Sequence, residues 1–140
     1  MDISREKPDF SGDWVLDRQA STLSSFAEGI RSAVARIEHH DPTFRYKATF
    51  VSETGQTPVE YELLSNGPEA VSTHQGTTIV SSLTWEGQAL VGTWHIQRPD
   101  VELKITFRHE LVDGGRRLRM VEQLRGGGRD QENVWSLERQ

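Results

Sequence analysis

The chain has 140 residues, 34% of them hydrophobic, a mean hydropathy of -0.61 and a formal net charge of -5 at pH 7. This length provides one hydrophobic core, so we expect a single domain over residues 1–140. No apolar run approaches the ~20 residues of a membrane-spanning helix. The acidic charge argues against a nucleic-acid partner, and the absence of cysteine excludes disulfides and thiolate chemistry.

The N-terminal residues 1–5 lack the apolar region of a secretory signal peptide. A cytoplasmic location is therefore expected by default, and a secreted or periplasmic one only if a leader was removed. Composition leaves the oligomeric state open between monomer and dimer.

The first predicted strand covers residues 10–17, where apolar residues alternate with polar ones. A helical segment is predicted over residues 21–35, with Ser21 or Thr22 as its N-cap. Its apolar positions, Leu23, Phe26, Ile30 and Val34, recur at spacings of three and four. Because Gly29 weakens the middle, a short helix or two turns with a break is expected.

Period-2 alternation between turn signals predicts nine further strands. They cover residues 34–39, 43–52, 57–64, 69–74, 77–85, 88–97, 101–112, 115–124 and 131–137.

Three dipeptides are interpreted as two-residue hairpin loops: Asn66-Gly67, Glu86-Gly87 and Asp113-Gly114. These loops set Tyr61 opposite Ser72, Leu83 opposite Leu90, and His109 opposite Leu118. Pairing across the glycine loop 126–128 sets Glu122 opposite Asn133 and Met120 opposite Trp135. The registers set by Glu86-Gly87 and Asp113-Gly114 each place apolar residues on one face of the sheet and mostly polar residues on the other, which indicates an antiparallel meander.

A meander of this length either exposes its edges or closes. Tight turns and ten short strands favour an all-β, closed antiparallel up-and-down barrel of about eight to ten strands, with one short helical segment after the first strand. The last strand would pair with the first. Such a barrel has room for one small ligand.

The segment Phe10-Ser11-Gly12-Asp13-Trp14-Val15-Leu16 resembles the Gly-x-Trp opening strand of the calycin superfamily, which includes lipocalins and fatty-acid-binding proteins. The chain is also similar, end to end, to a group of uncharacterised bacterial lipocalin-like proteins. That similarity rests on four segments: Gly12 to Asp17, His39-His40-Asp41-Pro42, Trp85 to Leu90, and Leu111-Val112-Asp113-Gly114.

The resemblance implies a barrel with tryptophan at its closed end and an apolar small molecule in its chamber. Fatty-acid-binding proteins hold a carboxylate with an Arg-x-Tyr pair on the last strand. Here the corresponding stretch, Asn133-Val134-Trp135-Ser136-Leu137, has neither residue. This departure argues against a fatty acid held in that way.

Strand alternation predicts which side chains face inward. The predicted apolar lining is Trp14, Phe44, Phe50, Leu83, Leu90, Trp94, Ile96, Leu103, Ile105, Phe107 and Met120. The predicted inward polar residues are Tyr46, Tyr61, Ser72, His74, Ser81, His109, Glu122 and Asn133. We expect a carrier or binding protein that holds an apolar or amphipathic small molecule. The ligand-binding residues selected from these sets are Tyr46, Tyr61, Ser72, Ser81, Leu83, Leu90, Trp94, Ile105, Phe107, Met120 and Asn133.

Two alternatives stay open. A cofactor-free isomerase, cyclase or hydratase would use Glu122 as acid or base with His109 or His74 as its partner. An interaction module would have a filled core and would use a strand edge or the arginines Arg116, Arg117, Arg119, Arg125 and Arg129.

No cofactor or metal site is predicted. His39 and His40 are adjacent on a strand and point to opposite faces, so they do not ligate one ion. A haem on His74 or His109 would have only the histidines themselves in its favour.

Overall fold

Ten strands in one antiparallel sheet make up the computed structural model, which describes residues 7–25, 27–128 and 130–140. The strands are β1 (Gly12–Leu16), β2 (Ile30–His40), β3 (Thr43–Ser52), β4 (Gly55–Leu64), β5 (Ala70–His74), β6 (Thr77–Glu86), β7 (Ala89–Gln97), β8 (Glu102–Val112), β9 (Arg117–Gly126) and β10 (Gln131–Arg139). A short 3-10 turn, Asp113–Gly115, connects β8 to β9.

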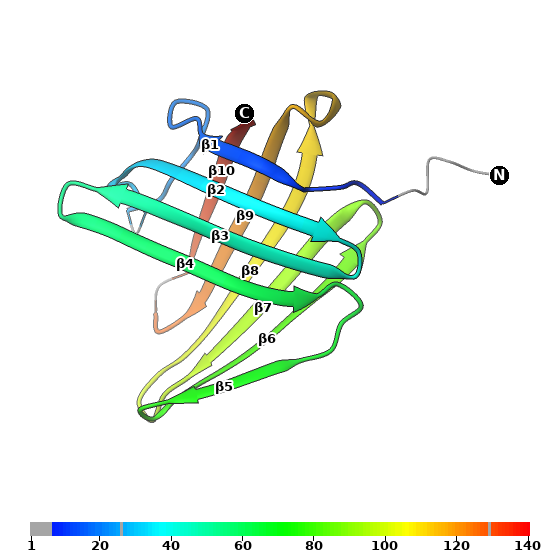
Figure 1. Ribbon diagram of the computed structural model, residues 1–140. Helices are drawn as coiled ribbons and strands as arrows, with labels where there is room; N and C mark the ends of the chain where they lie inside the picture. The colour runs from blue at the N-terminus through cyan, green and yellow to red at the C-terminus, as the bar shows by residue number, and fades with distance from the viewer. Residues whose placement is uncertain (1–6, 26, 129) are drawn as a thin grey trace.

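The sheet curls into a nearly closed barrel whose strand order is β4-β3-β2-β1-β10-β9-β8-β7-β6-β5. The predicted all-β barrel is confirmed, and so is the pairing of the first strand with the last: Trp14 of β1 lies opposite Arg139 of β10. Figure 1 shows β2, β3 and β4 crossing in front of β7 to β10, with the barrel interior between these two groups. None of the described segments is a helix long and apolar enough to cross a membrane.

The barrel has a gap between its two edge strands, β4 and β5. The predicted hairpin across Asn66-Gly67 is therefore wrong. In a two-residue loop, the residue after Gly67 would donate its N–H to the ladder, and Pro68 has none. Asn66 instead forms an isolated bridge with Thr84 of β6.

The helical segment predicted over residues 21–35 is also wrong. Hydrogen bonds from the N–H groups of Ala27 and Glu28 to the Ser24 carbonyl (2.9 and 2.8 Å) form only turns, and β2 begins at Ile30. Residues 30–35 pair with β3, and Ala35 also lies opposite Trp14 of β1. These two ladders outweigh a weak helical periodicity. Phe26, which contributed to that periodicity, lies outside the described residues.

Two hairpin registers differ from the prediction by two residues. His109 pairs with Met120 because the β8–β9 connection uses four residues, 113–116, rather than two. Leu83 pairs with Gly92 because the β6–β7 loop is Gly87-Gln88. A shift of two leaves every side chain on its predicted face. The predicted register between β9 and β10 is confirmed: Glu122 lies opposite Asn133, and Met120 opposite Trp135.

Large side chains fill the end of the barrel that holds the β2–β3 and β6–β7 turns. Phe10 stacks on Trp85 with ring centroids 6.0 Å apart, and Phe44 meets the His109 ring edge-on at 5.8 Å. Trp14 is fully buried nearby, and its indole N–H donates to the Phe10 carbonyl (3.1 Å). This end of the barrel is a packed core.

A polar cluster at the same end joins the exposed Asp41 to the buried His39 and Ser65. Asp41 Oδ1 accepts hydrogen bonds from the Ser65 hydroxyl (2.6 Å), Trp85 Nε1 (3.0 Å) and His39 Nε2 (3.2 Å). Burial opposes ionisation, but these donors outweigh it and hold the pKa of Asp41 below its ordinary value. His39 is buried and His40 exposed, so adjacent side chains take opposite faces here. The cluster anchors the β2–β3 turn.

Candidate functional site: a cavity inside the barrel

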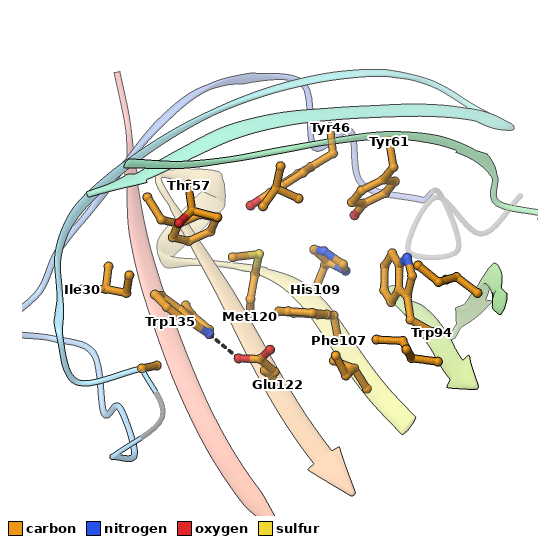
Figure 2. A pocket seen from close by; sticks show the side chains of 16 residues that line it. Ile30, Tyr46, Thr57, Tyr61, Trp94, Phe107, His109, Met120, Glu122 and Trp135 are labelled. Carbon is orange, nitrogen blue, oxygen red and sulfur yellow. Dashed lines mark hydrogen bonds between the residues drawn. The ribbon is translucent and has the colours of Figure 1, made fainter. Parts of the chain in front are cut away.

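The other end of the barrel holds an apolar cavity of about 470 Å³. Its apolar lining consists of Ala27, Ile30, Phe50, Val59, Ile79, Trp94, Ile96, Ile105, Phe107, Met120 and Trp135. Its polar lining consists of Tyr46, Thr57, Tyr61, His109 and Glu122. Figure 2 shows Tyr46 and Tyr61 entering from one wall, opposite Met120, Phe107, Trp94 and Glu122. A small molecule between these walls would contact mainly carbon.

Glu122 brings a carboxylate into this apolar space. The side chain is 9% exposed, and its Oε1 accepts hydrogen bonds from Asn133 Nδ2 (2.9 Å) and Trp135 Nε1 (3.1 Å). The β9–β10 register creates both contacts, since Asn133 lies directly opposite Glu122 and Trp135 lies two residues further along the same face. The dashed line in Figure 2 marks the bond to Trp135. Oε2 has no hydrogen-bond partner among the described residues.

His109 is a neutral side chain in this cavity. Its Nδ1 lies 2.9 Å from the Leu90 carbonyl oxygen, which only accepts, so Nδ1 carries the proton. Burial lowers the pKa of His109 to about 4 despite that bond, and the ring is neutral at neutral pH. Nε2 is therefore left as an acceptor.

The two tyrosines retain their phenolic protons. Burial raises the pKa of both, and the Glu122 carboxylate adds to the effect on Tyr46. The rings stack with centroids 5.1 Å apart, and Tyr61 also meets Trp94 edge-on at 5.1 Å. Neither hydroxyl has a hydrogen-bond partner among the described residues. Both groups are thus available to a ligand.

Among the predicted site residues, eight line the cavity: Tyr46, Tyr61, Trp94, Ile105, Phe107, His109, Met120 and Glu122. Asn133 is buried behind Glu122 as its hydrogen-bond donor. Leu83 and Leu90 point inward but belong to the packed end of the barrel, as do Trp14 and Phe44. Strand alternation specifies the face of a residue and not its height along the barrel.

Ser72 and His74 were expected to face inward, and both are exposed on the edge strand β5. They line a second pocket together with Ile79 and Arg98, and Glu122 is not part of its lining. Ser81, half-buried on β6, has its hydroxyl 3.4 Å from the Ala70 carbonyl and does not line the cavity. Ser72 lies opposite the cavity-lining Ile79 and shares its sheet face, but β5 is an edge strand whose residues are all exposed, so facing alone did not predict burial.

Of the eight other lining residues, Phe50 and Ile96 were in the predicted apolar lining, and six were in neither predicted inward set. Thr57, Val59, Ile79 and Trp135 share the inward face with residues that were selected, so alternation alone was sufficient to include them. Ala27 and Ile30 belong to the stretch that was predicted to be helical. No pattern in the local sequence therefore predicted that these two residues line the cavity.

The proposed catalytic pair is not joined in the structure. No hydrogen bond links the described side chains of His109 and Glu122, and the residue opposite Glu122 on β8 is Phe107. His74 lies outside the cavity. The carboxylate and the imidazole each bond to other groups.

Two arginines of the group 116–129, Arg117 and Arg119, pair with neighbouring acids. Arg117 binds Asp17 (3.1 Å) and Glu138 (2.8 Å), and Arg119 lies 3.8 Å from Glu110. Arg129 lies outside the described residues. These contacts join neighbouring strands and loops on the outer face of the barrel.

No protein-family model matches the chain, and a search of curated proteins finds no match either. Solved structures do resemble it. A secretory abundant heat soluble protein from Ramazzottius varieornatus is 14% identical, with a TM-score of 0.60 and 93% of this chain and 94% of that chain covered. Human cRBP IV is 16% identical, with a TM-score of 0.58 and 95% and 99% covered.

The fatty-acid-binding protein of Manduca sexta is 14% identical, with a TM-score of 0.54, and the match covers 93% of this chain and 99% of that one. At these identities the likeness concerns the fold. It agrees with the Gly-x-Trp opening at Gly12 and Trp14 and with the β1–β10 pairing. The chain therefore has the calycin-type barrel fold that the fatty-acid-binding proteins have.

Proposed function

We propose that this protein is a carrier or binding protein that holds one apolar or amphipathic small molecule inside its barrel. The observation that carries the proposal is the apolar cavity of about 470 Å³ with a few convergent polar groups. Its volume lies within the range of known ligand pockets, and its lining has their usual character. The fatty-acid-binding protein of Manduca sexta, which has the same fold, is named for a small apolar ligand.

Most of the affinity would come from removing apolar ligand surface from water, at about 25 cal/mol per Å². The aromatic walls formed by Trp94, Phe107 and Trp135 provide the matching surface. The polar groups at Glu122 and Tyr46 would fix the orientation of the ligand. Catalysis by Glu122 and His109 as a pair is not proposed, because no hydrogen bond joins these two described side chains.

Ile105→Lys tests the proposal with Nile red, a neutral dye that fluoresces in apolar surroundings. Ile105 lines the cavity, and a lysine there would place an ammonium group among carbon atoms. We expect the affinity for Nile red to fall at least about tenfold. The measurement is a fluorescence titration.

Thr106→Lys is the matched control, since Thr106 is the next residue on β8 and points to the outer face. Its affinity should equal that of the wild type. Circular dichroism verifies that both variants are folded. Equal Nile red binding by folded Ile105→Lys and by the wild type would refute binding in this cavity.

A further inference from the structure

Two of the five polar side chains that line the cavity, Glu122 and His109, offer it hydrogen-bond acceptors and no donors. Glu122 Oε1 already accepts two N–H groups, from Asn133 and Trp135, whereas Oε2 has no partner among the described residues. His109 Nε2 is an acceptor because Nδ1 donates to the Leu90 carbonyl. The cavity thus offers two fixed acceptors, one of them a carboxylate.

The lining contains no positive group to balance that carboxylate. None of its described residues is an arginine or a lysine, and burial keeps His109 neutral. The hydroxyls of Tyr46 and Tyr61 are neutral and able to donate or accept. A ligand would therefore meet a negative potential at the Glu122 end of the cavity.

We propose that the cavity selects an apolar molecule whose head group donates hydrogen bonds, a protonated primary amine above all, and that it discriminates against a carboxylate head group. The inference rests on the proposed function and specifies its ligand class. The head group would bind Glu122 Oε2, with the Tyr46 hydroxyl as a further acceptor, while the apolar chain lies along Phe107 and Trp94.

The order of preference follows from the charges. An ammonium group forms charge-assisted hydrogen bonds to a carboxylate, which are stronger than bonds between neutral groups. An alcohol donates one neutral hydrogen bond and should bind less tightly. A carboxylate would bring a second negative charge beside Glu122 in a space of low dielectric constant, where like charges repel strongly.

Three molecules with the same chain test this order: dodecylamine, 1-dodecanol and dodecanoate, each displacing bound Nile red at neutral pH. We expect dodecylamine to displace the dye at a concentration about tenfold lower than dodecanoate, with dodecanol between them. Equal or better displacement by dodecanoate would overturn the head-group inference while leaving the proposed function intact. A failure of Nile red to bind at all would overturn both.

Two variants locate the source of the preference. Glu122→Gln removes the charge and keeps the carbonyl oxygen that Asn133 and Trp135 bind. It should lower the ratio of amine to carboxylate affinity about tenfold. Glu60→Gln removes the same charge from an exposed residue on the outer face of β4 and should leave the ratio unchanged. Equal effects in both variants would assign the preference to the net charge of the protein and refute the assignment to Glu122.

Discussion

Asn133 links the cavity carboxylate to the loop that precedes β2. Its Oδ1 accepts from the Ser24 N–H (2.7 Å), and its Nδ2 donates to Glu122 Oε1 (2.9 Å). The side chain is 1% exposed, so neither group has access to bulk water. An unpartnered buried amide costs about 1–3 kcal/mol, which means that these bonds fix both the loop and the carboxylate.

His109 makes stability depend on pH. Burial lowers its pKa from 6.5 in the unfolded chain to about 4 in the folded protein. Its contribution is therefore complete above pH 6.5. As the pH falls towards 4, the unfolded chain binds a proton that the folded one does not, and the free energy of unfolding falls by at most about 3 kcal/mol.

Urea unfolding of the wild type and His109→Gln across this pH range measures the effect. The variant lacks the titrating ring, so its free energy of unfolding should fall less steeply with decreasing pH. The carboxylates and the other histidines titrate alike in both proteins, so their contributions to the pH dependence cancel in the comparison. Parallel pH profiles would contradict a buried neutral His109.

Two glycines with positive φ lie on or beside strands β8 and β9. Gly126, the last residue of β9, has φ +110°, and a Cβ there would lie 2.3 Å from the Glu102 carbonyl oxygen of β8. Gly114, in the turn between the same two strands, has φ +67° and open space around its Cα. The two positions share a positive φ, and only Gly126 is sterically confined.

Replacing each of these glycines by alanine separates conformational strain from steric overlap. Gly114→Ala should lower the free energy of unfolding by about 1 kcal/mol, the cost of a left-handed residue with a side chain. Gly126→Ala adds a backbone clash and should lower it by about 3 kcal/mol. Chemical denaturation of both variants gives the values. Equal losses would show that the close approach to Glu102 costs nothing.

The barrel has its lowest local stability at the gap between β4 and β5. β5 pairs only with β6, all five of its residues are exposed, and Val71 on it is 66% exposed. β9, by contrast, pairs on both sides and carries the buried Leu118, Met120 and Glu122. The open edge therefore has few contacts to lose on local opening.

Amide hydrogen exchange should follow this difference. The amides of β5 should exchange fastest among the strands, through local opening that leaves the rest folded, and those of β9 slowest, through global unfolding. Exchange measured by NMR or mass spectrometry resolves the two strands. Equal protection of β5 and β9 would mean that the gap is closed in solution.

Much of this architecture follows from local sequence patterns. Alternation at period 2 predicted the faces of Tyr46, Glu122 and Asn133, and the glycine loop after β9 fixed the pairing that joins the last two. Only the tertiary structure decided that Leu83 packs into the core while Phe107 lines the cavity, that residues 25 and 27–29 form turns, and that β5 does not pair with β4. The reason is that the face of a side chain is set by its own strand, whereas a cavity is the volume left unfilled by side chains from strands distant in sequence.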